Sequence, residues 1–222
     1  MKIAILGGTG DIGAGLALRW AKDTTHEIRI GSRHAEKAHD SVQQYEQTLA
    51  EFDTDVRFRG GTNPTMTENA DVVILAAPPE YVTALTEEIR GGLDRDAILV
   101  SPAVKIQRDA AGFHADPPAM GSLTAEVADV APPNVPVVGA FHSLAAGRLS
   151  TLDHELAIDT LVVGNDERAR ETIIDLASQI EGLRGIDGGP LEHAGIVEAL
   201  APLCINVAFH NDHMHDAGIR FT

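Results

Sequence analysis

Apolar runs and polar stretches alternate along most of the chain in a way that predicts strands separated by helices. Short apolar runs that end in glycine or polar residues predict buried strands at residues 2–6, 26–30, 71–76, 97–100, 135–140 and 159–163, with a possible short strand at 55–59. Helical spacing or helix-forming composition predicts helices near residues 13–21, 34–52, 79–91, 122–130 and 166–180. Strands that alternate with helices are typical of βαβ units, so we expect an α/β, Rossmann-type fold with a doubly wound, mostly parallel sheet.

Two later parts of the chain break this alternation. The stretch Ser101–Pro118 has no regular period, and we expect it to line a site. Gly182–Pro190 is rich in glycine and is the best candidate for a domain boundary, and Leu191–His210 is predicted to form one long apolar helix. The sequence therefore predicts a nucleotide-binding domain at residues 1–182 and a small helical C-terminal part at residues 183–222.

The apolar residues of that C-terminal helix cover more than one of its faces. A helix that is apolar on several sides must be buried on several sides, and the small C-terminal part cannot supply a core of its own. One face can lie on the nucleotide-binding domain, and a second copy of the chain is the simplest cover for the rest. We therefore expect a homodimer; the alternative is a monomer in which the domain and a ligand pocket cover the whole helix.

A glycine-rich turn follows the first predicted strand and opens the first predicted helix. The pattern G-x-G-x-x-G is formed by Gly8, Thr9, Gly10, Asp11, Ile12 and Gly13. In this context the glycines permit a tight turn and a close backbone approach, and the N-terminus of the helix holds a pyrophosphate. The alternative is a simple glycine turn, but the position between strand and helix favours dinucleotide binding.

The end of the second predicted strand indicates which dinucleotide binds. A site for NAD usually has Asp or Glu there to bind the 2′-hydroxyl of the ribose, whereas this chain has Ser32 and Arg33 and, shortly after, Lys37. A hydroxyl and two cations would bind a 2′-phosphate that an acid would repel. The sequence therefore predicts NADP(H) as the cofactor; the alternative is a solvated loop.

Charge and composition limit the partners and the location. Among 222 residues, 33 are Asp or Glu and 17 are Lys or Arg, which gives a net charge of −16. This charge disfavours a nucleic-acid partner and suggests a halophilic source, because concentrated salt screens the repulsion between carboxylates; an ordinary acidic enzyme is the alternative. The longest apolar run, residues 72–79, is too short to span a membrane. We expect a soluble cytoplasmic protein without disulfides, in which the single cysteine, Cys204, packs in the core.

Several catalytic classes lack their residues here. Short-chain dehydrogenases need a Tyr-x-x-x-Lys pair, but Tyr45 and Tyr81 are followed four residues later by Leu49 and Leu85. The chain also has no G-x-S-x-G nucleophile motif. Lys105 is interpreted as a surface lysine, and the sequence predicts no catalytic acid, base or nucleophile.

The histidines divide into two groups. His210, His213 and His215 lie beside Asp212 and Asp216, and we interpret this run as a solvated helix end rather than a metal site, because residues at this spacing spread around a helix axis. His142 follows a predicted strand, at the edge where doubly wound sheets bind ligands. The sequence leaves two roles open for His142: it can bind a ligand, or it can be a structural histidine bonded to the backbone.

Several segments taken together resemble one family, the NADPH-dependent coenzyme F420 reductases (F420H2:NADP+ oxidoreductases). The similar segments are 5–17, 30–37, 100–104, 140–146, 182–191 and 218–220. The first two are common among NADP enzymes, and the combination is much more specific. Pro79 and the polar, histidine-rich segment 210–216 depart from the family pattern.

The resemblance implies hydride transfer between a reduced 8-hydroxy-5-deazaflavin, coenzyme F420, and NADP+. It implies that Thr9, Gly10, Asp11 and Ile12 bind the pyrophosphate, that Ser32, Arg33 and Lys37 bind the 2′-phosphate, and that Pro78, Val104 and Ala146 lie along the rest of NADP. It implies that His142, Leu144 and Ala217 lie near the deazaflavin. Direct ring-to-ring transfer needs alignment and exclusion of water rather than an acid–base pair, consistent with the absence of such a pair.

Two other functions remain open from the sequence. One is an NADPH-dependent reductase of another small substrate, such as an imine or a metal chelate. The other is a non-catalytic NADP(H)-sensing protein that regulates a partner.

Overall fold

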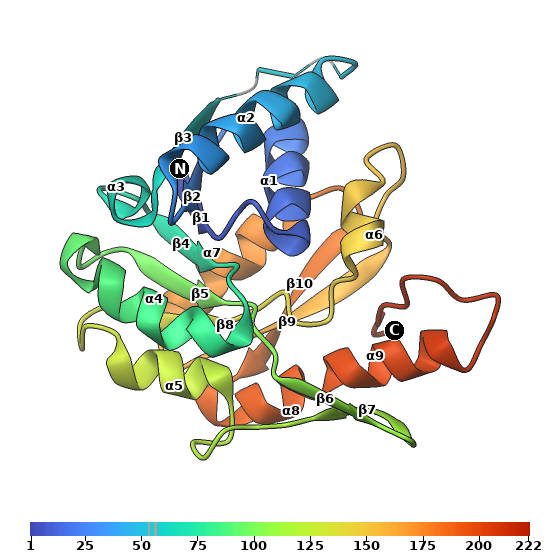
Figure 1. Ribbon diagram of the computed structural model, residues 1–222. Coiled ribbons are helices and arrows are strands. Elements are labelled where there is room, and N and C mark those ends of the chain that lie inside the picture. The colour runs from blue at the N-terminus through green and yellow to red at the C-terminus, as the bar shows by residue number, and fades with distance from the viewer. Residues whose placement is uncertain (53, 56) are drawn as a thin grey trace.

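The computed structural model describes residues 1–52, 54–55 and 57–222, which fold around one large twisted sheet (Figure 1). Eight strands lie in the order β10-β9-β8-β5-β4-β1-β2-β3. The strands are β1 (Lys2–Leu6), β2 (Glu27–Ser32), β3 (Phe58–Thr62), β4 (Val72–Leu75), β5 (Ile98–Ser101), β8 (Val137–Gly139), β9 (Ile158–Gly164) and β10 (Leu183–Gly189). All neighbouring pairs are parallel except β8 and β9, which are antiparallel. This confirms the predicted mostly parallel, Rossmann-type α/β fold.

Helices cover both faces of this sheet. They are α1 (Asp11–Asp23), α2 (Ala35–Leu49), α3 (Asn63–Thr67), α4 (Val82–Ile89), α5 (Leu123–Val130), α6 (Ala146–Ser150), α7 (Glu167–Ser178), α8 (Ala194–Glu198) and α9 (Leu200–Phe209), with short 3-10 turns η1 (Pro79–Tyr81), η2 (Arg90–Gly92) and η3 (Leu191–His193). Alternate residues of β1 enter two different cores: Ile3 and Ile5 pack with α1, α2 and α7, and Ala4 and Leu6 pack with α3, α4 and α5. The near-continuous apolar strands follow from this burial on both faces.

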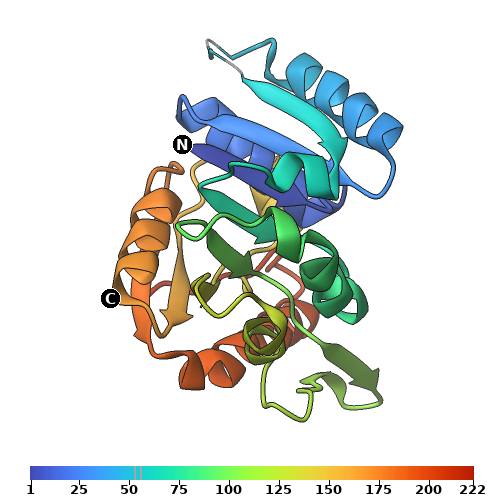
Figure 2. The ribbon, with the colours of Figure 1, turned by 90° about the vertical axis from the view of Figure 1, so that its left-hand side faces the viewer.

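The segment Ser101–Pro118 is more regular than the sequence suggested. It contains a two-stranded antiparallel hairpin of β6 (Ile106–Asp109) and β7 (Gly112–Ala115), which projects from the body of the molecule beside α9 (Figures 1 and 2). All four residues of β6 are exposed, so the strand has no buried face to produce an alternating pattern. Asn206 of α9 makes two hydrogen bonds to the backbone of Phe113. Its Oδ1 accepts from the Phe113 N–H at 2.9 Å, and its Nδ2 donates to the Phe113 carbonyl oxygen at 2.7 Å. These bonds fix the hairpin to the helix.

The glycine-rich segment 182–190 contributes β10, the edge strand of the main sheet, paired in parallel with β9. Glycine is required where α7 crosses this strand, because a Cβ on Gly185 would lie 2.7 Å from the backbone of Ile174. The possible strand at 55–59 is displaced: β3 begins at Phe58 and pairs with β2, while residue 56 of the predicted range lies outside the described residues. Pro136 directly precedes β8, an internal strand, consistent with a proline at a strand start.

The long apolar helix predicted over 191–210 is divided into η3, α8 and α9. The 19-residue run Leu191–Phe209 has a mean hydropathy of 1.3 and is one-third buried, so by length and composition alone it could cross a membrane. A single helix of this kind is weak evidence, because helices of soluble proteins pass the same test. His210, His213 and His215 lie beyond the end of α9 and are exposed, and no group of three His, Cys, Asp or Glu residues in the described ranges is placed to hold a metal ion.

Candidate active site: two adjoining cavities

The glycine-rich turn lies between β1 and α1, at the carboxyl edge of the sheet. Gly7 has a φ of +73°, and a Cβ there would lie 2.7 Å from the carbonyl oxygen of Ala76, so only glycine fits without strain. A Cβ on Gly13 would lie 2.7 Å from the Cα of Gly8, which brings the first turn of α1 tightly against the loop. Gly10 is the N-cap of α1 and provides no side-chain cap. The first N–H groups of a 13-residue helix are therefore available to an anion.

A first cavity of about 620 Å³ opens over this turn. It is lined by nine of the twelve residues predicted to bind NADP: Thr9, Gly10, Asp11, Ile12, Ser32, Arg33, Lys37, Pro78 and Val104. Gly8 and Gly13 lie behind the cavity wall, where they allow the close packing of the turn. Ala146 begins α6 and does not line this cavity.

The cationic end of the first cavity is open to solvent. Arg33 and Lys37 are exposed, and within the part of the chain that the structure describes neither forms an ion pair with a carboxylate. The Arg33 guanidinium lies 5.6 Å from the centroid of the Tyr81 ring. A cation stacked on an aromatic face has less freedom, and its N–H groups remain available for a phosphate. The sequence analysis did not identify Tyr81 or Asn63 as part of this site, although both line the cavity.

A second cavity of about 420 Å³ adjoins the first and has a mainly apolar wall. All three residues predicted near the deazaflavin, His142, Leu144 and Ala217, line it. The remaining wall comes from the start of α1, the loop after β5, the hairpin, the turn after β8 and the C-terminal part. It consists of Ile12, Pro102, Val104, Ile106, Ser143, Ala145, Ala201, Cys204, Ile205, Ala208 and Asp216. Cys204 is 8% exposed and also packs in this wall, which agrees with its predicted packing role.

Three residues belong to the walls of both cavities: Ile12, Pro102 and Val104. Ile12 comes from the first turn of α1, and the other two follow β5. The cavities therefore meet at an apolar junction between the glycine-rich turn and the loop after β5. Two planar ligands, one in each cavity, would approach each other at these three residues.

His142 is held in a buried turn at the edge of the second cavity. The preceding residue, Phe141, has a φ of +68°, a strained conformation for a bulky side chain. Two contacts hold it there: its N–H donates to Thr160 Oγ1 at 2.8 Å, and its ring packs edge-on against Trp20 at 5.6 Å. Burial lowers the pKa of His142 to about 4, so the imidazole is neutral at physiological pH.

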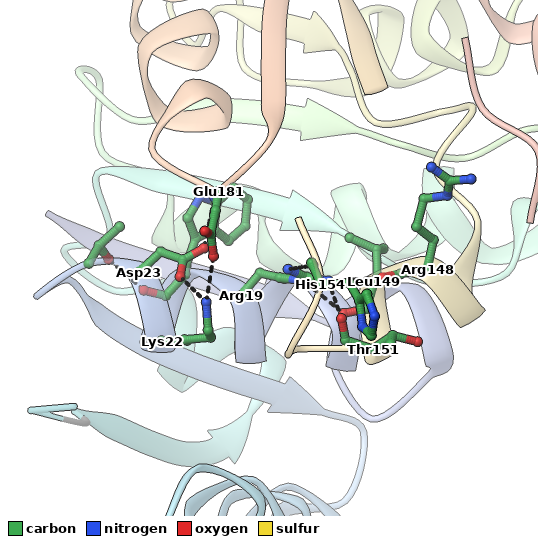
Figure 3. Close-up of polar contacts among 10 residues, drawn as sticks. Arg19, Lys22, Asp23, Arg148, Leu149, Thr151, His154 and Glu181 are labelled. Atoms are coloured by element: carbon green, nitrogen blue, oxygen red, sulfur yellow. Dashed lines mark hydrogen bonds and ion pairs between the residues drawn. The ribbon is translucent and has the colours of Figure 1, made fainter. Parts of the chain in front are cut away.

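Arg19 connects the helix of the glycine-rich turn to α6 and the residues that follow it. Its side chain is fully buried on α1 and donates to four backbone carbonyls at and after the end of α6, as Figure 3 shows: those of Arg148, Leu149, Thr151 and His154, at 2.6–3.0 Å. Gly15 lets the two helices approach, because a Cβ there would lie 2.5 Å from the Cβ of Leu149. The segment that follows His142 is thereby fixed to α1.

The comparisons with known proteins agree with this geometry. A family model described as "NADP oxidoreductase coenzyme F420-dependent" matches residues 2–105. An F420-dependent NADP reductase from Methanocaldococcus jannaschii is 39% identical over an alignment that covers 100% of this chain and 98% of that protein. The chain belongs to the F420-dependent NADP reductase family.

A second relative supports the same assignment, and two solved structures share the fold. The F420-dependent NADP reductase of Methanothermobacter thermautotrophicus is 36% identical, with 100% of this chain and 95% of that protein covered. A crystal structure from Arthrobacter sp. FB24, provisionally named an F420-dependent NADP reductase, aligns with a TM-score of 0.77 at 23% identity and covers 100% and 99% of the two chains. A pyrroline-5-carboxylate reductase from Coxiella burnetii aligns with a TM-score of 0.62 at 14% identity, covering 94% and 66%. At these identities the two structures show a shared fold alone.

Membership of this family confirms the resemblance seen in the sequence. The alignment with the relative from Methanocaldococcus jannaschii covers the whole length of the chain. Lys105, which we interpreted as a surface lysine, is half-exposed and pairs with Asp116 at 2.9 Å. Two buried charged residues that the sequence analysis did not single out, Arg19 and Glu198, bind backbone groups of distant segments. Sequence pattern gave no signal for their partners, which lie about 75 to 135 residues away along the chain.

Proposed function

We propose that this reductase-family protein transfers a hydride between reduced coenzyme F420 and NADP+, with the nicotinamide nucleotide in the first cavity and the deazaflavin in the second. The observation that carries this proposal is the junction at Ile12, Pro102 and Val104, where the two cavities share a wall. In the reaction the reduced deazaflavin loses a hydride and a proton, and NADP+ takes up the hydride. The family's curated relatives bear the name of this activity.

The chain's own residues provide binding and alignment in this proposal. Thr9, Gly10, Asp11 and Ile12 bind the pyrophosphate through the backbone at the N-terminus of α1. Ser32, Arg33 and Lys37 bind the 2′-phosphate, with Arg33 oriented by Tyr81. Pro78 and Val104 lie along the remainder of NADP, and Ala146 lies outside this cavity, at the start of α6. This arrangement distinguishes NADP from NAD by charge, because the 2′-phosphate is the group that the two exposed cations can bind.

The second cavity fits a flat, mostly apolar ring. His142, Leu144 and Ala217 contact the deazaflavin, and the surrounding residues of α9 exclude water. Alignment of two rings at the reacting distance accounts for much of the acceleration that such a site can provide. The part of the chain after β10 thus closes the deazaflavin site, and residues 1–182 hold the nucleotide.

A direct test follows the two coenzymes optically. Purified protein is mixed with NADPH and oxidised F420, and the loss of deazaflavin absorbance is recorded together with NADPH consumption. We expect equimolar loss of both, and much slower loss when NADH replaces NADPH. Oxidation of NADPH by a cyclic imine or a ferric chelate without any F420 turnover would instead indicate a reductase of another substrate. NADPH binding without turnover of any acceptor would indicate a sensor.

We also propose that the working form is a homodimer joined through the apolar surface of α8 and α9. Ile196 is 71% exposed, Leu203 54% and Phe209 59%, which leaves a row of large apolar side chains uncovered by the rest of the chain. Such a surface on a soluble protein marks an interface, and a second copy provides a matching apolar face. A cytoplasmic location is consistent with this form and with the reaction.

The substitution Leu203→Glu tests the dimer, since a carboxylate in an apolar interface is costly. Light scattering at working salt should show about twice 23.5 kDa for the natural protein and 23.5 kDa for the variant. Glu171→Gln, an exposed change on α7, is the control and should leave the mass unchanged. A natural protein that stays at 23.5 kDa at high concentration would contradict the proposal.

A further inference from the structure

Glu198 is a carboxylate buried in a mainly apolar surrounding, 5% exposed, at the end of α8. It lies at the N-terminus of α5 rather than beside a cation. Its two oxygens accept hydrogen bonds from the backbone N–H groups of Leu123 and Thr124, both at 3.0 Å, and from the Thr124 hydroxyl at 2.8 Å. These three donors and the helix N-terminus stabilise the ionised form, whereas burial raises the pKa of Glu198.

The Thr124 hydroxyl lies between this carboxylate and His142. Its oxygen is 3.5 Å from Nε2 of His142, and both side chains are buried. Gly139 makes the contact possible, because a Cβ on that residue would lie 2.9 Å from Thr124 Oγ1 and 3.0 Å from the imidazole Cε1. The three side chains therefore form a row from α8, through α5, to the turn after β8.

The hydrogen atoms along this row follow from the chemistry of the groups. An ionised carboxylate only accepts, so the single hydroxyl hydrogen of Thr124 is donated to Glu198. Thr124 Oγ1 then has only lone pairs for His142, and Nε2 must carry the imidazole hydrogen. A neutral imidazole has one N–H, so Nδ1 is left as an acceptor. Nδ1 is buried, and among the described residues it has no hydrogen-bond partner.

We propose that Glu198 is a positioning residue: through Thr124 it holds the His142 imidazole in one orientation, with its hydrogen on Nε2, in the wall of the proposed deazaflavin site. This rests on the proposed function for its ligand, because His142 lines the second cavity. The row of contacts also links the C-terminal part, which closes the cavity, to the group that the coenzyme meets there. Nδ1 has almost no accessible surface, so the coenzyme meets the ring of His142 rather than this nitrogen.

The position of the hydrogen can be measured without any coenzyme. Nitrogen-15 NMR of histidine-labelled protein at neutral pH distinguishes an imidazole nitrogen that carries hydrogen from one that does not, and the His142 signals are assigned by their loss in His142→Gln. We expect the hydrogen on Nε2 in the natural protein. A hydrogen on Nδ1 would overturn the proposal whether or not the Glu198 and Thr124 variants fold.

Variants test whether Glu198 and Thr124 cause this preference. In Glu198→Gln and in Thr124→Val, the His142 hydrogen should no longer be confined to Nε2. Thr124→Ser keeps the hydroxyl, so in that variant the hydrogen should stay on Nε2. Glu126→Gln makes the same change of charge on α5 and is the control, which should leave the signal unchanged. If the hydrogen stays on Nε2 in both Glu198→Gln and Thr124→Val, Glu198 acts only as a cap of α5, and the positioning role is overturned.

Kinetics then connect the tautomer to the ligand. In Glu198→Gln the His142 imidazole is no longer held in one orientation, so we expect the KM for F420 to rise roughly five- to tenfold, with the KM for NADPH unchanged. An equal rise for both coenzymes would indicate a general structural defect and contradict the proposal. If F420 is not turned over by the natural protein while the Nε2 hydrogen is found, the proposed function fails and the positioning of His142 stands.

Discussion

The two cavities are built in opposite ways. The first takes most of its polar residues from two short segments, 9–12 and 32–37, at or just after the ends of parallel strands. The second takes its wall from the loop after β5, the turn after β8, α9 and the tail near Ala217. Nucleotide binding at the first cavity therefore depends on local geometry, whereas the second cavity exists only when distant parts of the chain have packed together.

Charged residues in the two regions differ in whether they are exposed or buried. The cations of the first cavity are exposed and available to a ligand. Arg19 and Glu198, by contrast, are buried and used internally, one to bind carbonyls at and after the end of α6 and the other to bind N–H groups of α5. We expect that removing an internal charge affects stability most, and that removing an exposed charge affects mainly ligand binding.

The largest effect is expected from Arg19→Met. Methionine fills much of the space but leaves four carbonyls without their donors, one of them buried and three partly buried, and each unsatisfied group costs about 1–3 kcal/mol where water cannot reach it. We expect a loss of about 3–5 kcal/mol in the free energy of unfolding, since part of the segment can relax toward solvent. Denaturant titration at constant salt measures it.

The exposed Arg168 on α7 provides the matched control, because Arg168→Met removes the same charge from a surface position. It should change the free energy of unfolding by no more than about 0.5 kcal/mol. In the fraction of Arg19→Met that folds, the KM for F420 should rise more than the KM for NADPH. Equal stability of the two variants would mean that the carbonyls near α6 find other donors.

The same contrast explains what the sequence could and could not predict. Most of the strands and helices were predictable because each is buried on both faces or has a clear period, and the NADP end was predictable because Gly8–Gly13 and Ser32–Lys37 are local patterns. Residues such as His142 and Ala217 were assigned through family resemblance, and their meeting in one cavity depends on long-range packing. The hairpin of β6 and β7 escaped detection because it buries almost nothing of its first strand.

Acid should destabilise the second cavity through His142. The unfolded imidazole binds a proton below about pH 6.5, whereas the folded one stays neutral until about pH 4, so the unfolded state gains protons first as the pH falls. This contribution to stability is complete above pH 6.5 and is lost between pH 6.5 and 4, by about 3 kcal/mol for a shift of this size. Unfolding free energies measured across this range should show it.

The variant His142→Gln isolates that contribution from the carboxylates that titrate nearby. Burial raises the pKa of Glu198, which acts in the opposite direction because the folded state then binds the proton more readily. Glu198 is present in both proteins, so the difference between their pH profiles reports His142. Parallel profiles between pH 4 and 6.5 would show that His142 is not kept neutral by burial.

The smallest effect is expected at the open end of the first cavity. Arg33→Ala removes one exposed cation that we propose to bind the 2′-phosphate, and water and salt screen that interaction. NADPH binding should weaken by about 1–2 kcal/mol, roughly five- to thirtyfold, and NADH binding should change little.

A second variant, Arg33→Lys, keeps the charge but loses the planar stacking on Tyr81. Its affinity for NADPH should lie between that of the natural protein and that of Arg33→Ala. Titration at the lowest salt that keeps the protein folded measures both affinities, with Arg168→Ala as the control for net charge. Equal weakening of NADPH and NADH would place Arg33 outside the 2′-phosphate site. The free energy of unfolding should stay within about 0.5 kcal/mol of the natural value, because Arg33 contributes to a binding surface and not to the internal contacts that assemble the second cavity.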